Sequence, residues 1–149
     1  GLFELHGEIR NFLKMCKDQV SFINPYDQII WSIDKKYLLL LSNAGINIPQ
    51  THLVKKGKHL DLLKFCSIKG WKEVVVKPCV SAAAWNTHHI KKFNSSAQIL
   101  FNSLIKKHDM MIQLFQNNIV TSGESSIMMI NGEYSHAVLK KAKRGDYRV

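Results

Sequence analysis

Cysteine is scarce in this sequence, and the three cysteines that occur lie far apart: Cys16, Cys66 and Cys79. None belongs to a C-x-x-C pair or to a Cys/His cluster with the spacing of metal ligands. Disulfide-stabilised domains and structural zinc sites both need such groups of cysteines. The sequence therefore supports neither class, and we expect reduced thiols in a cytoplasmic protein.

Long hydrophobic runs are also absent. The most apolar stretch, YLLLLSNAG, is far shorter than the run of about 20 residues that spans a membrane. The first residues, GLFELHGEIRNFLKMCKD, lack the basic start and long apolar centre of a signal peptide. We therefore expect no membrane partner. An initiator methionine is missing too, which suggests a piece of a longer protein.

Acidic residues are outnumbered, because 11 Asp and Glu stand against 21 Lys and Arg, for a net charge of +10. Such a balance suits polyanions, which include nucleic acids, anionic lipids and phosphorylated small molecules. The basic residues are scattered, mostly as pairs, and form no long basic arm. A solvated lysine-rich surface is the simpler explanation, and nucleic acid is not expected as the main partner.

Several catalytic signatures are missing. No G-x-x-x-x-G-K-[ST] or G-x-G-x-x-G occurs, which excludes a Walker-type NTPase and a protein kinase on motif grounds. No H-E-x-x-H occurs, and GESS is not the G-x-S-x-G of a serine nucleophile. His88 and His89 are adjacent, so on a strand they face opposite sides and cannot easily bind one ion. No histidine metal site is expected.

The residues that are present predict one α+β domain, since 149 residues suffice for a single hydrophobic core. Apolar periodicity predicts helices over residues 2–17, 60–68 and 95–107. Another helix is expected between Ser32 as N-cap and Gly45 as stop. Gly70 should end the helix over 60–68, and Ser95 or Ser96 should cap the one over 95–107.

The strands predicted after these helices favour mixed or antiparallel pairing over a doubly wound repeat. β-branched and apolar runs predict strands over residues 74–77, 87–93 and 110–115, with a short strand after the loop INIPQ. The stretch INPYDQ is expected to be a turn. Asn131 and Gly132 predict a hairpin between strands over 125–130 and 134–140.

One lysine stands at the end of a strand of the buried type. The stretch VVVKP places Lys77 after three valines, and a lysine ammonium inside a core is costly unless it is paired or faces an anion. The small residues of SAAA, which begin at Ser81, offer backbone N–H groups that can fold over phosphates. The alternative is that Lys77 marks the solvent end of an edge strand, which Pro78 also allows.

Polar residues near the ends of later strands are further candidates. The amides of Gln113 and Gln116, with the backbone of QLFQ, could match a purine edge. Glu124 stands between a glycine and a strand, where it could accept hydrogen bonds from ribose hydroxyls. Lys140 and Arg148 follow, and an arginine can hold a phosphate or carboxylate bidentately. Taken singly, the glutamines and Glu124 are better explained as exposed polar residues at strand ends.

Three stretches in order resemble one family. They are a lead-in, NPYDQIIWSIDKKYLLLLSNAGINIPQTHLV, a loop segment, VVVKPCVSAAAWNTHHI, and a final run, MMIQLFQNNIVTSGESSIMMINGEYSHAVLKKAKRGDYRV. Together they resemble the ATP-grasp superfamily of carboxylate–amine ligases, in the branch related to glutathione synthetase and the cyclo-ligase of cycloserine biosynthesis. The resemblance implies a partial ATP-grasp fold: a helical lead-in over 1–50, the small lobe over 51–113, and the hinge and start of the large lobe over 114–149.

The resemblance also implies roles for individual residues. Those that would contact or cover ATP phosphates are Lys35, Lys77 and Ser81. Those that would form the hinge and hold adenine, largely through backbone groups, are Gln113, Leu114, Phe115 and Gln116. Glu124 would take the ribose hydroxyls, and Lys140 and Arg148 would face the γ-phosphate or the acyl phosphate. The loop departs from the family because it carries Trp85 and Asn86 and no glycine.

The implied activity is that of a ligase in which ATP phosphorylates a carboxylate and an amine then attacks the acyl phosphate. Mg²⁺ would accompany ATP, with ligands outside this chain, because the family's metal-binding residues lie downstream of DYRV. The expected partners are ATP and a small-molecule carboxylate or amine, with a homodimer left open. The piece is expected to be inactive alone. The alternatives are a basic nucleic-acid-binding module and a non-catalytic remnant of the fold.

Overall fold

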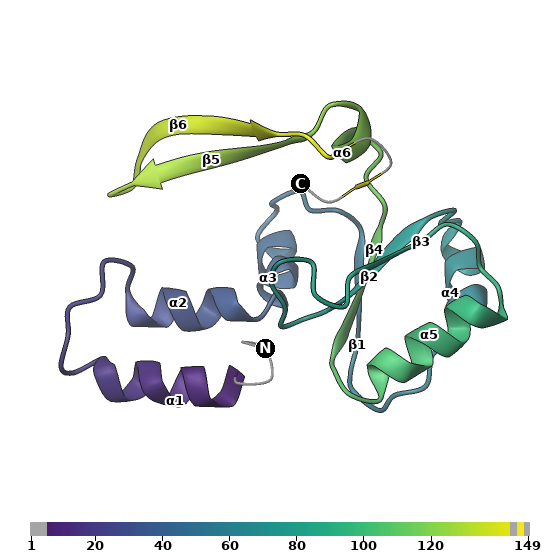
Figure 1. Cartoon of the computed structure of the whole chain (residues 1–149), viewed down its shortest axis with the longest axis horizontal. Coiled ribbons are helices and arrows are strands. Elements are labelled where there is room, and N and C mark those ends of the chain that lie inside the picture. Colours follow the sequence, from purple (N-terminus) through teal and green to yellow (C-terminus); the bar gives the residue numbers. More distant parts are fainter. Residues whose placement is uncertain (1–5, 144–145, 148–149) are drawn as a thin grey trace. The chain divides into compact units, whose positions relative to one another are not determined.

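The computed structural model describes residues 6–143 and 146–147 (Figure 1). Its internal contacts divide the chain into two compact units, Gly1–Leu114 and Phe115–Val149. The described elements of the first unit are α1 (His6–Cys16), α2 (Tyr26–Ile33), α3 (Tyr37–Asn43), β1 (Thr51–Val54), α4 (Leu62–Lys69), β2 (Val74–Pro78), β3 (His88–Ile90), α5 (Ser95–Ile105) and β4 (Met110–Leu114). Those of the second unit are α6 (Asn118–Thr121), β5 (Glu124–Ile130) and β6 (Glu133–Lys140).

The strands of the first unit form one sheet in the order β1-β4-β2-β3. Gln113 of β4 lies opposite Thr51 of β1 and Val75 of β2, and Val75 in turn lies opposite His89 of β3. β3 is shorter than the strand expected over 87–93. All three pairings are antiparallel, which agrees with the predicted α+β class.

One face of this sheet packs against α4 and α5 (Figure 1). Val74 and Val76 of β2 and Ile112 of β4 are fully buried there. They belong to one hydrophobic cluster with Leu62 of α4 and Phe101 of α5, both of which are also fully buried. Because full burial of such a side chain stabilises the fold by about 1.5–3 kcal/mol, this cluster fixes which face of the sheet the helices cover.

The two helices on this face start with side-chain caps. Asp61 accepts a hydrogen bond from the backbone N–H of Lys64 at 2.9 Å, and α4 ends at Gly70, whose φ is 66°. The predicted stop at Gly70 is therefore confirmed. Asn94 caps α5, since its side chain accepts from Ala97 N–H at 3.0 Å. The predicted cap at Ser95 or Ser96 is wrong because both serines already lie inside the helix.

The helix α2 is the largest departure from the sequence expectations. The stretch INPYDQ was expected to be a turn, whereas the helix begins at Tyr26, directly after Pro25. Ser32 was expected to cap the next helix, but it lies inside α2, and its hydroxyl donates to the carbonyl oxygen of Ile29 at 2.9 Å. A proline is well tolerated at a helix start, so it did not exclude a helix here. The predicted stop near Gly45, whose φ is 83°, is confirmed.

The second unit contains the hairpin β5–β6, preceded by α6, which the sequence did not predict. Asn131 and Gly132 join its strands, with φ values of 53° and 83°. Two central residues with positive φ define the type I′ turn that an Asn-Gly pair favours, so the predicted hairpin is confirmed. Gly123, just before β5, has a φ of 91°, and a Cβ there would lie 2.4 Å from the carbonyl oxygen of Lys140. The close approach of β6 therefore requires a glycine at this position.

Candidate functional site

Lys35, from the turn between α2 and α3, reaches the loop that follows β2. Its ammonium donates hydrogen bonds to the carbonyl oxygen of Ser81 and to the Ser81 hydroxyl, with Nζ 2.9 Å from Oγ. That hydroxyl donates to the carbonyl oxygen of Pro78 at 3.1 Å. The backbone N–H of Lys35 donates to the carbonyl oxygen of Cys79 at 2.9 Å. Two residues assigned to phosphates, 46 positions apart in the sequence, are thus in direct contact.

The ammonium of Lys35 is only partly solvated. Burial lowers the pKa of Lys35, and the neighbouring Cys79 and Asp34 offset part of that shift. A pKa that burial lowers means that the charged form is less stable here than in water. A phosphate beside the ammonium would restore part of that stability through a charge-assisted hydrogen bond.

Lys77 lies on the sheet face opposite to α4 and α5. Because side chains alternate along a strand, Val75 and Lys77 point away from the buried core of β2. Gln113 lies directly opposite Val75 and so shares this face. The structure therefore brings Lys77 and Gln113 to one face of the sheet, with Lys77 at the end that leads into the loop of Ser81.

This face also carries a paired histidine that the sequence reasoning did not assign to it. His89 Nε2 lies 2.7 Å from Glu73 Oε2, and the His89 side chain is 6% exposed. Burial lowers the pKa of His89, and the hydrogen bond with Glu73 opposes that shift. The available signal was strand alternation, because His89 pairs with Val75 and must share its face with Lys77.

Two donors of the expected adenine-binding stretch are used within the first unit. Gln113 is 7% exposed, and its Nε2 donates to Thr51 Oγ1 at 2.9 Å. The backbone N–H of Leu114 donates to the carbonyl oxygen of Gln50 at 2.9 Å. The division between the two units falls between Leu114 and Phe115. Recognition of a base by this stretch would therefore depend on groups other than Gln113 Nε2 and the Leu114 N–H.

The rest of the expected hinge belongs to the second unit. The Phe115 ring lies edge-on to the ring of Tyr147, with the centroids 6.2 Å apart. Gln116 lies just before α6, and its carbonyl oxygen accepts a hydrogen bond from the N–H of Ile119, inside that helix, at 3.1 Å. Arg148, the predicted contact of the γ-phosphate, lies outside the described residues.

The loop between β2 and β3 is held in a strained conformation. Ala83, Ala84 and Asn86 have φ values of 48°, 56° and 49°. Each of the two alanines costs about 1–2 kcal/mol relative to an ordinary backbone conformation, because glycine and, to a lesser degree, asparagine are the residues that adopt this region readily. The indole ring of Trp85 lies edge-on to His108, with the ring centroids 5.1 Å apart. The lack of glycine therefore comes with strain that packing must offset.

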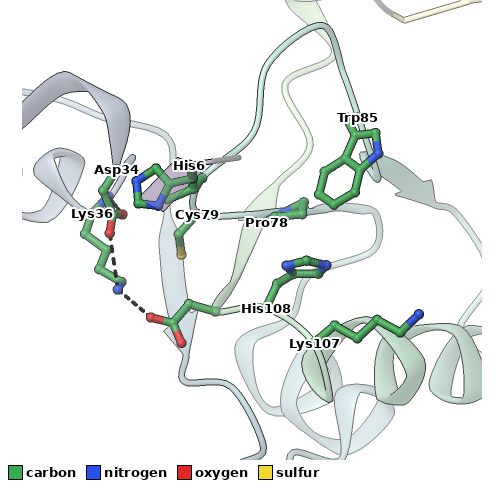
Figure 2. A pocket seen from close by; sticks show the side chains of 10 residues that line it. His6, Asp34, Lys36, Pro78, Cys79, Trp85, Lys107 and His108 are labelled. Atoms are coloured by element: carbon green, nitrogen blue, oxygen red, sulfur yellow. Dashed lines mark hydrogen bonds and ion pairs between the residues drawn. The ribbon is translucent and has the colours of Figure 1, made fainter. Parts of the chain in front are cut away.

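A cavity of about 300 Å³ lies beside this loop (Figure 2). The residues that line it are His6, Asp34, Lys36, Pro78, Cys79, Val80, Trp85, Lys107, His108 and Asp109. Lys36 forms ion pairs with both acids, with Nζ 3.3 Å from Asp34 Oδ2 and in a short contact with Asp109 Oδ2. Burial raises the pKa of the Cys79 thiol to about 11, so that thiol is neutral near pH 7.

In the second unit, Glu124 and Lys140 lie directly opposite each other on β5 and β6. Lys140 Nζ is 3.3 Å from Glu124 Oε1, and the two side chains are 43% and 48% exposed. An ion pair this exposed contributes about 1 kcal/mol or less to stability, because water and salt screen it. Each side chain can therefore leave this ion pair and bind a polar ligand at a small cost in free energy.

Within residues 6–143 and 146–147, no three or more His, Cys, Asp or Glu side chains gather closely enough to hold a metal ion. The acids beside Lys36 are engaged in ion pairs, so no described residue is assigned to Mg²⁺. No helix in the described part of the chain is long and apolar enough to cross a membrane.

The fold formed by these elements is the ATP-grasp fold of a ligase. The chain is similar to the crystal structure of D-cycloserine synthetase DcsG, with a TM-score of 0.81 and 24% sequence identity. The match covers 93% of this chain and 48% of that one, so this chain spans about half the length of the solved structure. The predicted partial ATP-grasp fold is thereby confirmed.

A family model gives the finer assignment. The ATP-grasp domain of prokaryotic glutathione synthetase matches residues 37–149, and the chain belongs to that family. The predicted glutathione synthetase-like branch is therefore confirmed. The matched region includes Lys77, Ser81 and Glu124, whereas Lys35 lies just before it. No curated protein matches the chain.

Proposed function

We propose that the chain binds ATP along the sheet face of Lys77, as the nucleotide-binding part of an ATP-dependent carboxylate–amine ligase. The observation that carries the proposal is the contact of Lys35 with Ser81, which holds a partly buried ammonium against the loop that follows Lys77. Membership of the ATP-grasp family supports ATP as the nucleotide. The polyphosphate is the anion that would stabilise both lysines at this end of the sheet.

In the first unit, Lys35 and Lys77 would neutralise phosphate charge. A phosphate oxygen would replace the Ser81 carbonyl as the partner of Lys35 Nζ, and the loop would cover the β- and γ-phosphates. The N–H groups of Trp85 and Thr87 each close a backbone hydrogen bond within the loop at 3.0 Å, so other N–H groups of the loop would face the phosphates. Adenine would contact backbone groups of the expected hinge stretch, Gln113, Leu114, Phe115 and Gln116, other than the Leu114 N–H.

In the second unit, Glu124 would accept hydrogen bonds from the ribose hydroxyls. Lys140 lies opposite it and would face the γ-phosphate or the acyl phosphate, as would Arg148. In the chain without a ligand the two side chains form an ion pair at 3.3 Å, which the nucleotide would open. The exposure of both side chains supports exchange for such a ligand.

The proposed reaction has two steps. An oxygen of the substrate carboxylate attacks the γ-phosphorus of ATP, the bond to the β–γ bridging oxygen breaks, and ADP leaves. An amine nitrogen then attacks the carbonyl carbon of the acyl phosphate, phosphate leaves, and the nitrogen loses a proton. The lysines of this chain would contribute by positioning and by stabilising negative charge. Mg²⁺, when bound with ATP, would supply further charge neutralisation.

Calorimetric titration of the chain with ATP tests the proposal. We expect saturable binding that shorter phosphate chains weaken, because the lysines at the end of the sheet act on the phosphates. A folded chain, verified by circular dichroism, that shows no binding even at millimolar ATP would contradict the proposal. If the same sample instead bound an oligonucleotide with steep salt dependence, the nucleic-acid-binding alternative would replace it.

A further inference from the structure

Asp109 lies between the end of α5 and the start of β4. No sequence motif predicted a function for it. Its carboxylate accepts hydrogen bonds from Lys36 Nζ and from the backbone N–H of Lys56, the latter at 2.8 Å. Its carbonyl oxygen accepts the N–H of Cys79 at 2.9 Å. One residue therefore joins three segments that are distant in sequence: the turn before α3, the turn after β1 and the loop after β2.

The first of these segments also carries Lys35. The backbone N–H of Lys35 donates to the carbonyl oxygen of Cys79 at 2.9 Å. The N–H of the same cysteine donates to the carbonyl oxygen of Asp109. The next side chain, Lys36, forms ion pairs with Asp34 and Asp109, and all three residues line the cavity. Figure 2 shows Lys36 beside Asp34. The segment is thus fixed on both sides of the Lys35 side chain.

We propose that Asp109 is a positioning residue for phosphate binding: it holds Lys36 and the loop after β2 so that the Lys35 ammonium is directed toward Ser81 and the phosphates. This inference rests on the proposed function, because it takes Lys35 as a ligand of ATP phosphates. Asp109 does not contact the nucleotide, since its carboxylate is engaged by Lys36 and Lys56.

The charges around Asp109 maintain this arrangement near neutral pH. The hydrogen bond from Lys36, followed by that from the Lys56 N–H, lowers the pKa of the Asp109 carboxyl. The same contact with Asp109 raises the pKa of Lys36. Without the carboxylate, the Lys36 side chain would lose its main anchor, and the turn that places Lys35 beside Ser81 would lose its side-chain link to the start of β4. Loss of Asp109 therefore alters phosphate recognition and leaves base recognition intact.

The variant Asp109→Asn tests this role through the binding of ATP, measured by calorimetry, and of adenosine, measured by saturation-transfer NMR. We expect the affinity for ATP to fall about tenfold, the scale of one charge-assisted hydrogen bond, and the affinity for adenosine to stay unchanged. Asp61→Ala is the matched control, because it removes another acid's hydrogen bond, the cap of α4 at Lys64 N–H. Both affinities should be unchanged in that control.

Equal losses for ATP and adenosine, or full retention of ATP affinity, would overturn the role of Asp109. If Asp109→Asn does not fold, Lys36→Met removes the same ion pair from the other side, and we expect the same selective loss of ATP affinity. The wild-type chain distinguishes the two failures. Absence of ATP binding by the wild type defeats the proposed function and this inference with it, whereas ATP binding that Asp109→Asn retains defeats the inference alone.

Discussion

Lys35→Met is expected to lower the affinity for ATP by about 10- to 100-fold, which corresponds to the loss of one hydrogen bond to a charged group. Methionine keeps the apolar stem that packs beside the loop and removes only the ammonium. Ser81 would lose a side-chain hydrogen-bond partner at 2.9 Å, yet its hydroxyl would keep the bond to Pro78. Calorimetric titration with ATP and with adenosine measures the effect, and adenosine affinity should not change.

Lys107→Met is the control for this substitution. Lys107 is an exposed lysine just after α5 that lines the cavity, and it has no proposed phosphate contact. Its loss changes the net charge by the same amount and should leave ATP affinity within about twofold, because exposed charges are screened by salt. A decrease in affinity that is the same for both variants would mean that general charge, and not the position of Lys35, governs binding.

Gly123→Ala is expected to open the hairpin next to Lys140. The added Cβ would lie 2.4 Å from the Lys140 carbonyl oxygen, which is a backbone atom that cannot rotate away, and the φ of 91° would add strain. An isolated two-stranded hairpin is only marginally stable, so it has little energy to offset such a clash. The opposed positions of Glu124 and Lys140 should be lost, and ATP binding should weaken with them.

Gly132→Ala separates the clash from the backbone strain. Gly132 has a φ of 83°, but a Cβ there meets no atom within 4 Å, so the cost is limited to the conformational term of about 1 kcal/mol. Amide hydrogen exchange and cross-strand NOEs along β5 and β6 measure both variants. If Gly123→Ala preserves the pairing between Glu124 and Lys140 as well as Gly132→Ala does, the close approach of β6 does not require this glycine.

Local sequence signals were reliable where one residue type decides the backbone. Gly45 and Gly70 stop their helices, and Asn131 and Gly132 form the hairpin turn, because positive φ is costly for other residues. The cap of α5 was placed one or two residues late, at Ser95 or Ser96, because asparagine and serine are both good caps and only the fold chooses between them. The helix after Pro25 was missed for a similar reason: a proline marks a turn as readily as a helix start.

The candidate site was only partly predictable. The resemblance supplied Lys35 and Ser81 as separate phosphate contacts, but their hydrogen bond spans 46 positions and no local pattern contains it. Asp109 was overlooked because a single acid before a buried strand has no distinctive neighbours, and its partner Lys36 lies 73 positions away. Alternation places Gln113 on the face of Lys77, whereas its hydrogen bond to Thr51 depends on the pairing of β1 with β4. Such contacts follow from strand order, which the sequence did not specify.

The most direct test of ATP binding at this sheet face is amine acylation of the folded chain with and without ATP, with each lysine followed by mass spectrometry. If the phosphates lie at the end of β2, saturating ATP should slow the acylation of Lys35 and Lys77 and leave that of Lys107 unchanged. If ATP binds but Lys35 and Lys77 react at unchanged rates, the phosphates bind elsewhere, and the assignment of this face to the nucleotide is wrong.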